Sequence, residues 1–491
     1  MRKKGLCLLI IVALLFVALG SVTAAAPKRQ FEGVTVVVAN NAGGNSDYFA
    51  QAAKPWEEMT GAKVEMNPIP FGDIKDKVLA AMSTDTFIAD VLVVPSGISG
   101  DLMGGGYVIP VPEESKQRIQ VDDLIPGYLD VNLTWAGVQY AWPWDGDVHT
   151  LNYRADIINN PDYQAAFEAK FGYPLAVPKT WKEYKDVAQF MMEDAGLPYG
   201  WAEVAGRRNG SFHAFSDRAV GYAKHPDDPA FYFDPMTMDA RINNPGFVRA
   251  LEDWVASLPY APPGVATYGF SECKLDFITG VVGLAVNWTD VGVAANSPIE
   301  SILEPGQASY AILPGSTEVW NSLTDEWETF EELNQPGYAA FGGWIIMIPT
   351  NAKNMEAAIS LADFMASPET MTIASQTPLS GVNPARISTL QDIQGWIERA
   401  GFPSEENAKA YVDSILNSLL ADNVVFQLRI PGYNQYEDAL ELAISEALTG
   451  QKSPQKALDD AAAAWNEITD RLGREVQLKA YRDSLSLSPL E

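Results

Sequence analysis

The sequence predicts an α/β protein built on open, doubly wound sheets. Strand-like and helix-like stretches alternate along the chain, which is the pattern of this class. Between residues 34 and 94 the order is strand, helix, strand, helix, strand. The last of these strands, residues 89–94, is apolar apart from Asp90 and is ended by Pro95, as expected for a parallel strand covered on both faces. In such a sheet, ligands bind beyond the carboxyl ends of the strands, here at residues 40–45 and 96–97.

Apolar runs and apolar residues at helical spacing predict the remaining elements in order. Strands are predicted at residues 34–39, 63–69, 89–94, 283–288, 309–313 and 343–348. Helices are predicted at residues 49–59, 75–82, 181–191, 355–365, 440–448 and 458–472. Thr180 is placed to begin one helix, Gly450 to end another, and Pro454 lies near a helix start, where proline is tolerated. The stretch 484–491 is predicted to be a frayed tail.

Length and charge narrow the functional classes. A chain of 491 residues suggests two to four domains or lobes, and 47% apolar with 20% charged residues is typical of a folded protein. The net charge of −29 and the pI near 4.4 argue against binding to nucleic acid or to an anionic membrane surface.

Residues 1–24 have the pattern of a cleaved signal peptide. Arg2, Lys3 and Lys4 precede an apolar run at 6–19 that is too short to span the ~30 Å hydrocarbon core. Residues 22–24 then offer small side chains for cleavage. No cysteine follows the run, so no lipid anchor is predicted, and we expect export to the periplasm. Loss of the leader would take the net charge from −29 to −32.

Several kinds of site are excluded by residue count. Cys7 lies in the leader, so Cys273 alone remains, and neither a disulfide framework nor a cysteine-based zinc site can form. His149, His213 and His225 lack the spacing of metal ligands. No HExxH, GxxxxGK[ST] or GxSxG motif occurs.

One aromatic and acidic run stands out as a candidate site. Residues 140–149 combine Tyr140, Trp142 and Trp144 with Asp145 and Asp147. Aromatic faces stack on the apolar faces of sugar rings, and carboxylates accept hydrogen bonds from the hydroxyls. Pro143 and Gly146 make a regular central strand unfavourable here, so a loop or crossing segment is predicted.

Alternatives remain for this run and for two similar groups. The two tryptophans could be core residues with the aspartates capping a turn, or Asp145 and Asp147 could be a glycosidase pair. Residues 287–290 repeat the pairing of tryptophan with aspartate at a strand end, and residues 342–344 add a third tryptophan. Three such groups beside predicted strand ends favour a binding site.

The chain also resembles a known family, the bacterial extracellular solute-binding proteins of family 1, the carbohydrate-binding subunits of ABC importers. The segments that carry the resemblance run almost the length of the mature chain: residues 34–41, 89–91, 140–156, 177–184, 231–238, 277–280, 283–288, 341–349, 384–386 and 457–458. The P-x-T-W-x-E-Y helix start and the G-G-W strand are fairly specific together.

The resemblance implies a two-lobed periplasmic-binding-protein fold of type II topology, with a hinge and an interlobe cleft. Crossings near Asp145, Pro314 and Pro378 would give one lobe of residues 27–145 plus 314–377 and another of 146–313 plus 378–483. It also implies a monomer that works with membrane ABC permease subunits and their ATPase, without a cofactor or catalytic residues.

The resemblance further implies which positions line the cleft. They are Asn40, Asn41, Asn45, Ser96, Trp142, Trp144, Asp145, Asp147, Trp288, Asp290, Gly343, Trp344 and Tyr433. Among them, Asp147 falls where relatives place an acidic ligand contact. The chain departs from the family in an acidic segment around 320–335 and in a 96–97 loop without an aromatic or acidic side chain.

Three functions are therefore compared. The first is a periplasmic receptor for a sugar or oligosaccharide. The second is a receptor for a cation such as a betaine or polyamine, held in a cage of Trp142, Trp144 and Trp288. The third is a secreted glycoside hydrolase that uses Asp145 or Asp147. The family resemblance favours the first.

Overall fold

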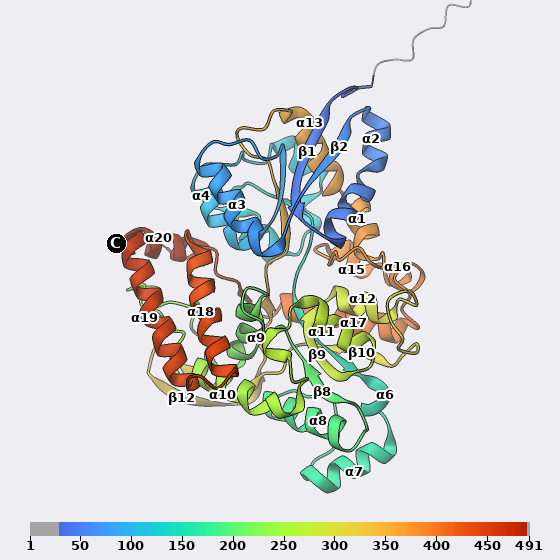
Figure 1. Cartoon of the computed structure of the whole chain (residues 1–491), viewed down its shortest axis with the longest axis vertical. Helices are drawn as coiled ribbons and strands as arrows, with labels where there is room; N and C mark the ends of the chain where they lie inside the picture. Colours follow the sequence, from blue (N-terminus) through green and yellow to red (C-terminus); the bar gives the residue numbers. More distant parts are fainter. Residues whose placement is uncertain (1–28, 489–491) are drawn as a thin grey trace, which may run out of the picture.

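A computed structural model describes residues 29–488 (Figure 1). The predicted signal peptide, Cys7 and the last three residues of the predicted tail lie outside this range. Figure 1 shows the chain gathered into an upper part that contains β1 and β2 and a larger lower part that contains β8, β9 and β10.

The upper part is built on a five-stranded sheet in the order β2-β1-β3-β14-β6. Its strands are β1 (Thr35–Asn41), β2 (Lys63–Ile69), β3 (Val91–Pro95), β14 (Trp344–Met347) and β6 (Trp142–Pro143). Strands β2, β1 and β3 are parallel, whereas β14 runs antiparallel to both β3 and β6. The four strands predicted for this sheet are confirmed, and β3 is buried along its whole length.

The upper part of the molecule also contains seven helices from two stretches of the sequence: α1 (Gly44–Ala52), α2 (Lys54–Thr60), α3 (Phe71–Ser83), α4 (Ser99–Gly104), α5 (Glu113–Arg118), α13 (Met355–Met365) and α14 (Pro368–Ser375). The helix predicted at 49–59 is two helices, α1 and α2, which meet at Ala53. Pro55 explains the break, because proline has no backbone N–H and its ring excludes a continuous helix at that point.

The lower part is built on a four-stranded sheet in the order β10-β7-β9-β8. Its strands are β7 (His149–Arg154), β8 (Tyr199–Ala202), β9 (Val282–Trp288) and β10 (Ala308–Ala311). Strand β9 is fully buried, pairs parallel to β8 and antiparallel to β7, and ends at Trp288. The carboxyl end of β9 faces the upper part of the molecule (Figure 1).

The lower part contains the helices α6 (Ala155–Ile158), α7 (Pro161–Phe171), α8 (Trp181–Glu193), α9 (Ser211–Ala223), α10 (Pro245–Ser257), α11 (Phe270–Ile278), α12 (Asp290–Asn296) and α17 (Glu405–Leu419). Of these, α6, α8, α11, α12 and α17 pack against strands of the second sheet. Helix α8 begins with a capping box, in which the Thr180 hydroxyl accepts from the Glu183 N–H and the Glu183 carboxylate accepts from the Thr180 N–H. The helix start predicted at Thr180 is confirmed.

The acidic segment that the sequence could not place is a β-hairpin. Strands β11 (Ser316–Asn321) and β12 (Glu326–Asn334) pair antiparallel, and β11 packs against α9. The Asn334 amide donates to the carbonyls of Gly221 and Lys224 at the end of α9. The hairpin thus packs on elements of the lower part, although the family resemblance implied that residues 314–377 belong to the upper lobe. We therefore propose that the second crossing lies near 340–343.

Three long helices end the described chain: α18 (Tyr433–Leu448), α19 (Pro454–Leu472) and α20 (Arg474–Ser484). Gly450, at φ +72°, lies in the turn between α18 and α19, as predicted. Shorter elements connect the rest of the chain: η1 (Ser96–Ile98), η2 (Val121–Asp123), η3 (Tyr128–Asn132), η4 (Leu258–Tyr260), η5 (Val265–Thr267), β4 (Thr134–Trp135), β5 (Val138–Gln139), β13 (Tyr338–Ala339), β15 (Val425–Phe426), α15 (Ile387–Gln391) and α16 (Ile393–Glu398).

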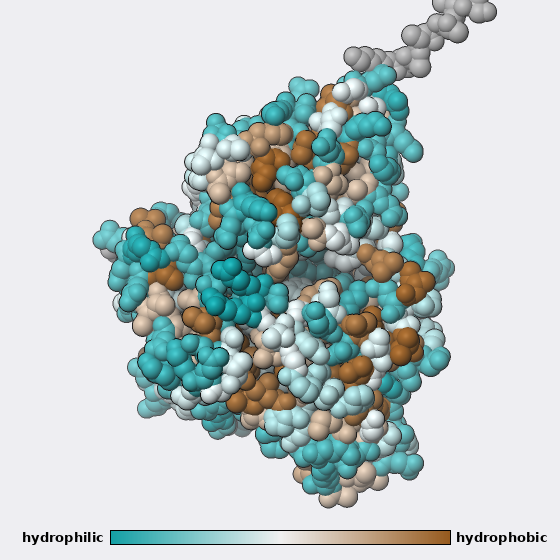
Figure 2. All heavy atoms as spheres, viewed as in Figure 1, coloured by the Kyte–Doolittle hydropathy of each residue, from teal (hydrophilic) through white to brown (hydrophobic). Residues whose placement is uncertain are grey.

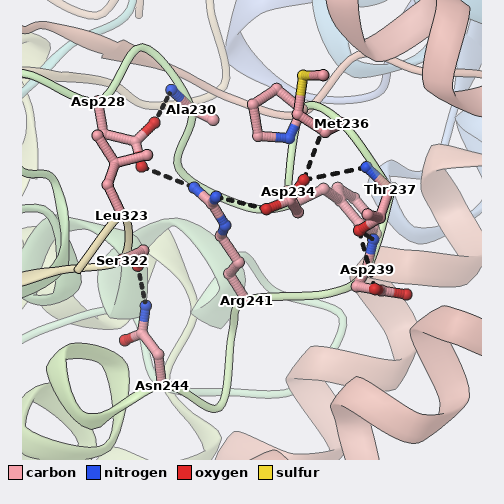
Figure 3. Close-up of polar contacts among 12 residues, drawn as sticks. Asp228, Ala230, Asp234, Met236, Thr237, Asp239, Arg241, Asn244, Ser322 and Leu323 are labelled. Carbon is pink, nitrogen blue, oxygen red and sulfur yellow. Dashed lines mark hydrogen bonds and ion pairs between the residues drawn. The ribbon is translucent and has the colours of Figure 1, made fainter. Parts of the chain in front are cut away.

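A partly buried arginine organises the irregular segment that precedes α10 (Figure 3). The Arg241 guanidinium donates to Asp228 and to Asp234, each at 2.7 Å. Asp228 and Asp234 in turn accept from the backbone N–H groups of Ala230 and Met236. The Asp228 side chain is only 3% exposed, so removal of Arg241 would leave a buried charge without its partner.

Replacement of Arg241 by Leu should therefore lower the free energy of unfolding by about 3 kcal/mol or more. Arg249→Leu is the matched control, because Arg249 lies 3.9 Å from Glu318 in an exposed pair whose loss should cost under about 1 kcal/mol. Urea denaturation of both variants measures the difference. Equal effects would show that the Asp228–Arg241–Asp234 network does not hold this segment.

Candidate functional site

A cavity of about 800 Å³ lies between the two sheet-containing parts. The face shown in Figure 2 is hollowed at mid-height, where these parts meet. The walls come from the loop after β1, the segment between β6 and β7, the end of β9, helix α11 and the segments around 341–344 and 379–383. A smaller cavity of about 240 Å³ shares Phe71 and Phe341 with it and continues toward α18.

Asp145 and Asp147 lie in this cavity because the backbone between β6 and β7 is tightly held. The Asp145 N–H donates to the Trp344 carbonyl at 3.1 Å, and the Gly146 N–H donates to the Asn383 carbonyl at 3.1 Å. A Cβ on Gly146 would come within 2.4 Å of the Pro384 carbonyl oxygen, so only glycine fits there. The two aspartates are only 4% and 3% exposed.

Asn383 joins the three aspartates of the cavity. Its backbone N–H and its side-chain amide both donate to Asp145, and the same amide donates to Asp147. Its side-chain oxygen accepts from the Thr289 hydroxyl at 2.7 Å and from the Asp290 N–H at 2.6 Å. One asparagine therefore links the β6–β7 segment to the start of α12.

Burial and mutual repulsion keep these carboxyl groups partly protonated. Burial raises the pKa of Asp145 to about 8, with a further contribution from the charge of Asp290 and an opposing one from the Asn383 hydrogen bonds. Burial and the charges of Asp145 and Asp290 also raise the pKa of Asp147 well above its usual range. Burial raises the pKa of Asp290 to about 6, against the effect of Lys274. The cluster can thus donate as well as accept hydrogen bonds.

Aromatic rings form a continuous row beside the aspartates. Ring centroids are 5.8 Å apart for Phe270 and Trp288, 6.1 Å for Trp288 and Phe341, and 5.4 Å for Phe341 and Trp344. Phe71 from α3 stacks on Phe341 at 5.9 Å. All five rings line the cavity, so apolar faces and carboxyl groups meet in one space.

The segment before β14 has a strained backbone. Phe341, Gly342 and Gly343 have φ values of +64°, +58° and +84° in succession. A left-handed phenylalanine is costly, and such strain persists where the surroundings hold it in place. A Cβ on Gly343 would lie 1.8 Å from the Asp145 carbonyl oxygen, so glycine is required for the crossing segments to approach.

The predicted site residues divide into three groups: residues that line the cavity, residues that support this lining, and residues buried outside it. The cavity is lined by Asn41, Asn45, Asp145, Asp147, Trp288, Asp290 and Trp344. Three others support this lining: the Asn40 amide donates to Asn45, the Ser96 hydroxyl donates to the Phe341 carbonyl, and Gly343 lies against Asp145.

Trp142, Trp144 and Tyr433 are buried outside the larger cavity. The Trp142 indole donates to Asp363 at 2.8 Å within the upper core. Trp144 packs against Phe49 at 5.1 Å, and its indole N–H lies 3.4 Å from Asn45. The Tyr433 hydroxyl donates to Glu437 at 2.7 Å. Neither tryptophan presents a free face to a ligand here, because Trp142 on the edge strand β6 and Trp144 directly after it are both fully buried.

Other lining residues were not singled out from the sequence. They include Phe71, Asn209, Phe270, Lys274, Phe341 and Asn383. Two of these could have been found from the sequence, because they adjoin segments already noted there. Phe341 precedes the Gly342-Gly343-Trp344 run, and Asn383 precedes the Pro384-Ala385-Arg386 run. The helical residues Phe270 and Lys274 had no such signal, since they form one turn of an ordinary amphipathic helix.

Comparison with known proteins identifies the family. The family model described as bacterial extracellular solute-binding protein matches residues 42–372. The chain belongs to this family. It is 24% identical over 470 residues to a probable ABC transporter-binding protein of Deinococcus radiodurans, a match that covers 90% of this chain and 95% of the relative.

Solved structures show the same fold. A solute-binding protein from Agrobacterium radiobacter, in complex with ribitol, superposes with a TM-score of 0.71 at 18% identity and covers 90% of this chain and 100% of its own. The maltose-bound MalE3 of T. maritima gives 0.69 at 20% identity, covering 89% of this chain and 100% of that one. The predicted fold class, a two-lobed periplasmic-binding fold of type II topology, is therefore confirmed.

Within residues 29–488, no group of three or more His, Cys, Asp or Glu side chains is arranged to hold a metal ion. No helix in that range combines the length and the apolar character needed to cross a membrane. The family and its solved neighbours are substrate-binding proteins and not enzymes.

The raised pKa values predict how stability depends on pH. Because the folded cluster binds protons more tightly than the unfolded chain, its contribution is complete below about pH 4 and is lost as the pH rises through about 6 to 8. The melting temperature of the ligand-free protein should therefore fall from pH 5 to pH 8 more steeply than that of Asp147→Asn.

Asp413→Asn is the control for this comparison, since Asp413 lies in an exposed pair with Lys409 on α17. It should keep the wild-type slope in a differential scanning fluorimetry series. An unchanged slope in Asp147→Asn would show that the Asp145–Asp147–Asp290 cluster does not titrate in this range.

Proposed function

We propose that this protein is the extracytoplasmic substrate-binding subunit of an ABC importer and that it binds a carbohydrate in the cavity between its two lobes. The observation that carries the proposal is the composition of that cavity, which unites carboxyl groups, amides and a row of aromatic rings. A volume of about 800 Å³ falls in the range of small-molecule sites.

The polar groups suit a polyol. Asp145, Asp147 and Asp290 line the cavity, and so do Asn41 and Asn45 from the segment around the end of β1. The side-chain oxygen of Asn41 and the side-chain nitrogen of Asn45 are buried without a hydrogen-bond partner among the described residues. Such groups cost free energy until a ligand satisfies them, which favours a ligand with several hydroxyl groups.

The aromatic row suits the apolar faces of a sugar ring. Trp288 and Trp344 are 8% and 7% exposed, so each keeps a small part of its surface open to the cavity. Solved relatives with this fold are described as bound to ribitol, maltose and D-mannitol. These titles support a carbohydrate or polyol as the class of ligand.

The two other candidate functions receive less support. A cage of Trp142, Trp144 and Trp288 for a quaternary amine would need rings that face one space, but Trp142 lies in the upper core against Asp363. A hydrolase would need free catalytic carboxyl groups, but Asn383 holds both Asp145 and Asp147. Membership of a binding-protein family argues in the same direction.

The partners and location form part of the same proposal. The family is described as extracellular, and the relative from D. radiodurans as a probable transporter-binding protein. We propose that residues 1–24 direct export to the periplasm, where the chain works as a monomer. It would deliver its ligand to permease subunits in the inner membrane.

Trp288→Ala should weaken carbohydrate binding by roughly 1–3 kcal/mol, about 5- to 150-fold, because a desolvated aromatic contact is lost. A thermal-shift panel of mono- and oligosaccharides and polyols would first find the ligand that raises the melting temperature most. Isothermal titration calorimetry of that ligand then measures the effect of the substitution.

Trp327→Ala provides the control, because Trp327 is 37% exposed on the β11–β12 hairpin. It should leave the affinity unchanged. If no carbohydrate or polyol in the panel shifts the melting temperature, or if Trp288→Ala binds as tightly as the wild type, the proposed site is wrong.

A further inference from the structure

The charged groups that line the cavity are mostly acidic. Asp145, Asp147, Asp290 and Glu272 are opposed by one cation, Lys274. The Lys274 ammonium lies 2.6 Å from a carboxylate oxygen of Glu300, a residue outside the larger cavity whose side chain is 6% exposed. Its charge is thus already matched, and no cation within the described lining is left to balance the three aspartates.

Two of these carboxyl groups keep capacity for a ligand. Asp147 is 3% exposed, and the Asn383 amide is the one side chain among residues 29–488 that donates to it. Asp290 is 8% exposed, and no side chain in that range donates to its carboxyl group. Both residues line the cavity. A neutral sugar would satisfy their hydrogen bonds, but whatever negative charge they carry would stay buried without a partner.

The aromatic row favours a cation at the same place. The electron-rich faces of Trp288, Phe341 and Trp344 attract a positive charge that lies within about 6 Å of a ring centre. A protonated amine on a sugar ring would meet carboxylates on one side, while the C–H face of the same ring would stack on an aromatic face.

We propose that the preferred ligand is an amine-bearing carbohydrate, such as an amino sugar or an oligosaccharide of amino sugars. This inference rests on the proposed function and specifies the substrate class of the same cavity. The protonated amine replaces protons that the aspartate cluster holds when no ligand is bound. Hydroxyl groups then bind the amides of Asn41 and Asn45, and the ring stacks on the aromatic row.

Proton release follows from this exchange. The titratable groups that face the cluster from the packed elements are Asp145, Asp147, Tyr128, Glu272, Lys274, Asp290, Glu300 and Tyr411. Tyr128 and Tyr411 are buried with a raised pKa, so they stay neutral in this range. Affinity for a protonated amine should therefore rise as the pH increases from 5.5 to 7.5, while affinity for a neutral sugar changes little.

Matched ligands test the proposal directly. D-glucosamine, N-acetyl-D-glucosamine and D-glucose differ at one ring position, and acetylation removes the charge while it keeps the ring. The same comparison extends to the 1,4-linked dimers and trimers of glucosamine and N-acetylglucosamine. Calorimetry of the mature protein should show at least tenfold tighter binding of the amine within each set. Titrations in buffers of different ionisation enthalpy should also show that protons are released.

Substitutions that remove the charge of an aspartate but keep its shape test whether that charge causes the preference for an amine. Asp290→Asn and Asp147→Asn should each reduce the ratio between amine and acetylated affinities at least fivefold, whereas Asp413→Asn should leave that ratio unchanged. Two isosteric variants are used so that a folding defect in one does not end the test. A ratio that persists in both would overturn the proposal.

Three other results would also decide whether the proposal holds. If neutral sugars bind as tightly as their amines, the proposed function stands and this inference is wrong. If putrescine or glycine betaine binds as tightly as the amino sugars, the cavity recognises a cation without a sugar ring, and the inference is wrong in that respect. If no sugar of either kind binds, the proposed function fails and the inference fails with it.

Discussion

The arrangement of the cavity depends on a single side chain, that of Asn383. Its amide group and its backbone N–H hold Asp145 and Asp147, and its side-chain oxygen holds the start of α12. These partners come from segments far apart in the sequence. Because a neutral amide can donate and accept at once, it satisfies several buried groups without a further charge. An aspartate at this position would add a fourth acidic side chain to the cluster, and when ionised that side chain could not donate.

Buried carboxyl groups and a strained backbone meet at the same place. The left-handed Phe341 projects its ring into the cavity, and Gly343 lets the segment after it approach Asp145. Both features cost stability in the ligand-free protein. Functional sites are where such costs are expected to concentrate, since a ligand that pairs with the carboxyl groups recovers part of them. The strained backbone at Phe341 and the buried carboxyl groups therefore indicate the same binding site.

Aromatic residues serve two distinct roles in this fold. Trp142 and Trp144 fill the upper core, whereas Trp288 and Trp344 lie at the ends of strands and face the cavity. All four belong to runs of similar composition, so sequence alone treated them alike. The difference comes from strand position: β6 is an edge strand whose side chains are covered by helices, while β9 ends where the two lobes face each other.

Local pattern was sufficient for most elements of the fold. The alternation of strands and helices, the cap at Thr180 and the turn at Gly450 are short-range features, and each was confirmed. Seven of the residues predicted for the site, which belong to groups beside predicted strand ends, line the cavity. Asn383 and the packing of the 316–334 hairpin did not follow, because their partners are distant in sequence: Asp145 lies 238 residues from Asn383, and Gly221 lies 113 residues from Asn334. Phe341 and Lys274 were not predicted as site residues either. The sequence by itself determined which segments become strands and helices, since periodicity and capping act locally. Only the tertiary structure decided which tryptophans are core and which carboxyl groups share one cavity, because burial depends on neighbours that the chain brings together from a distance.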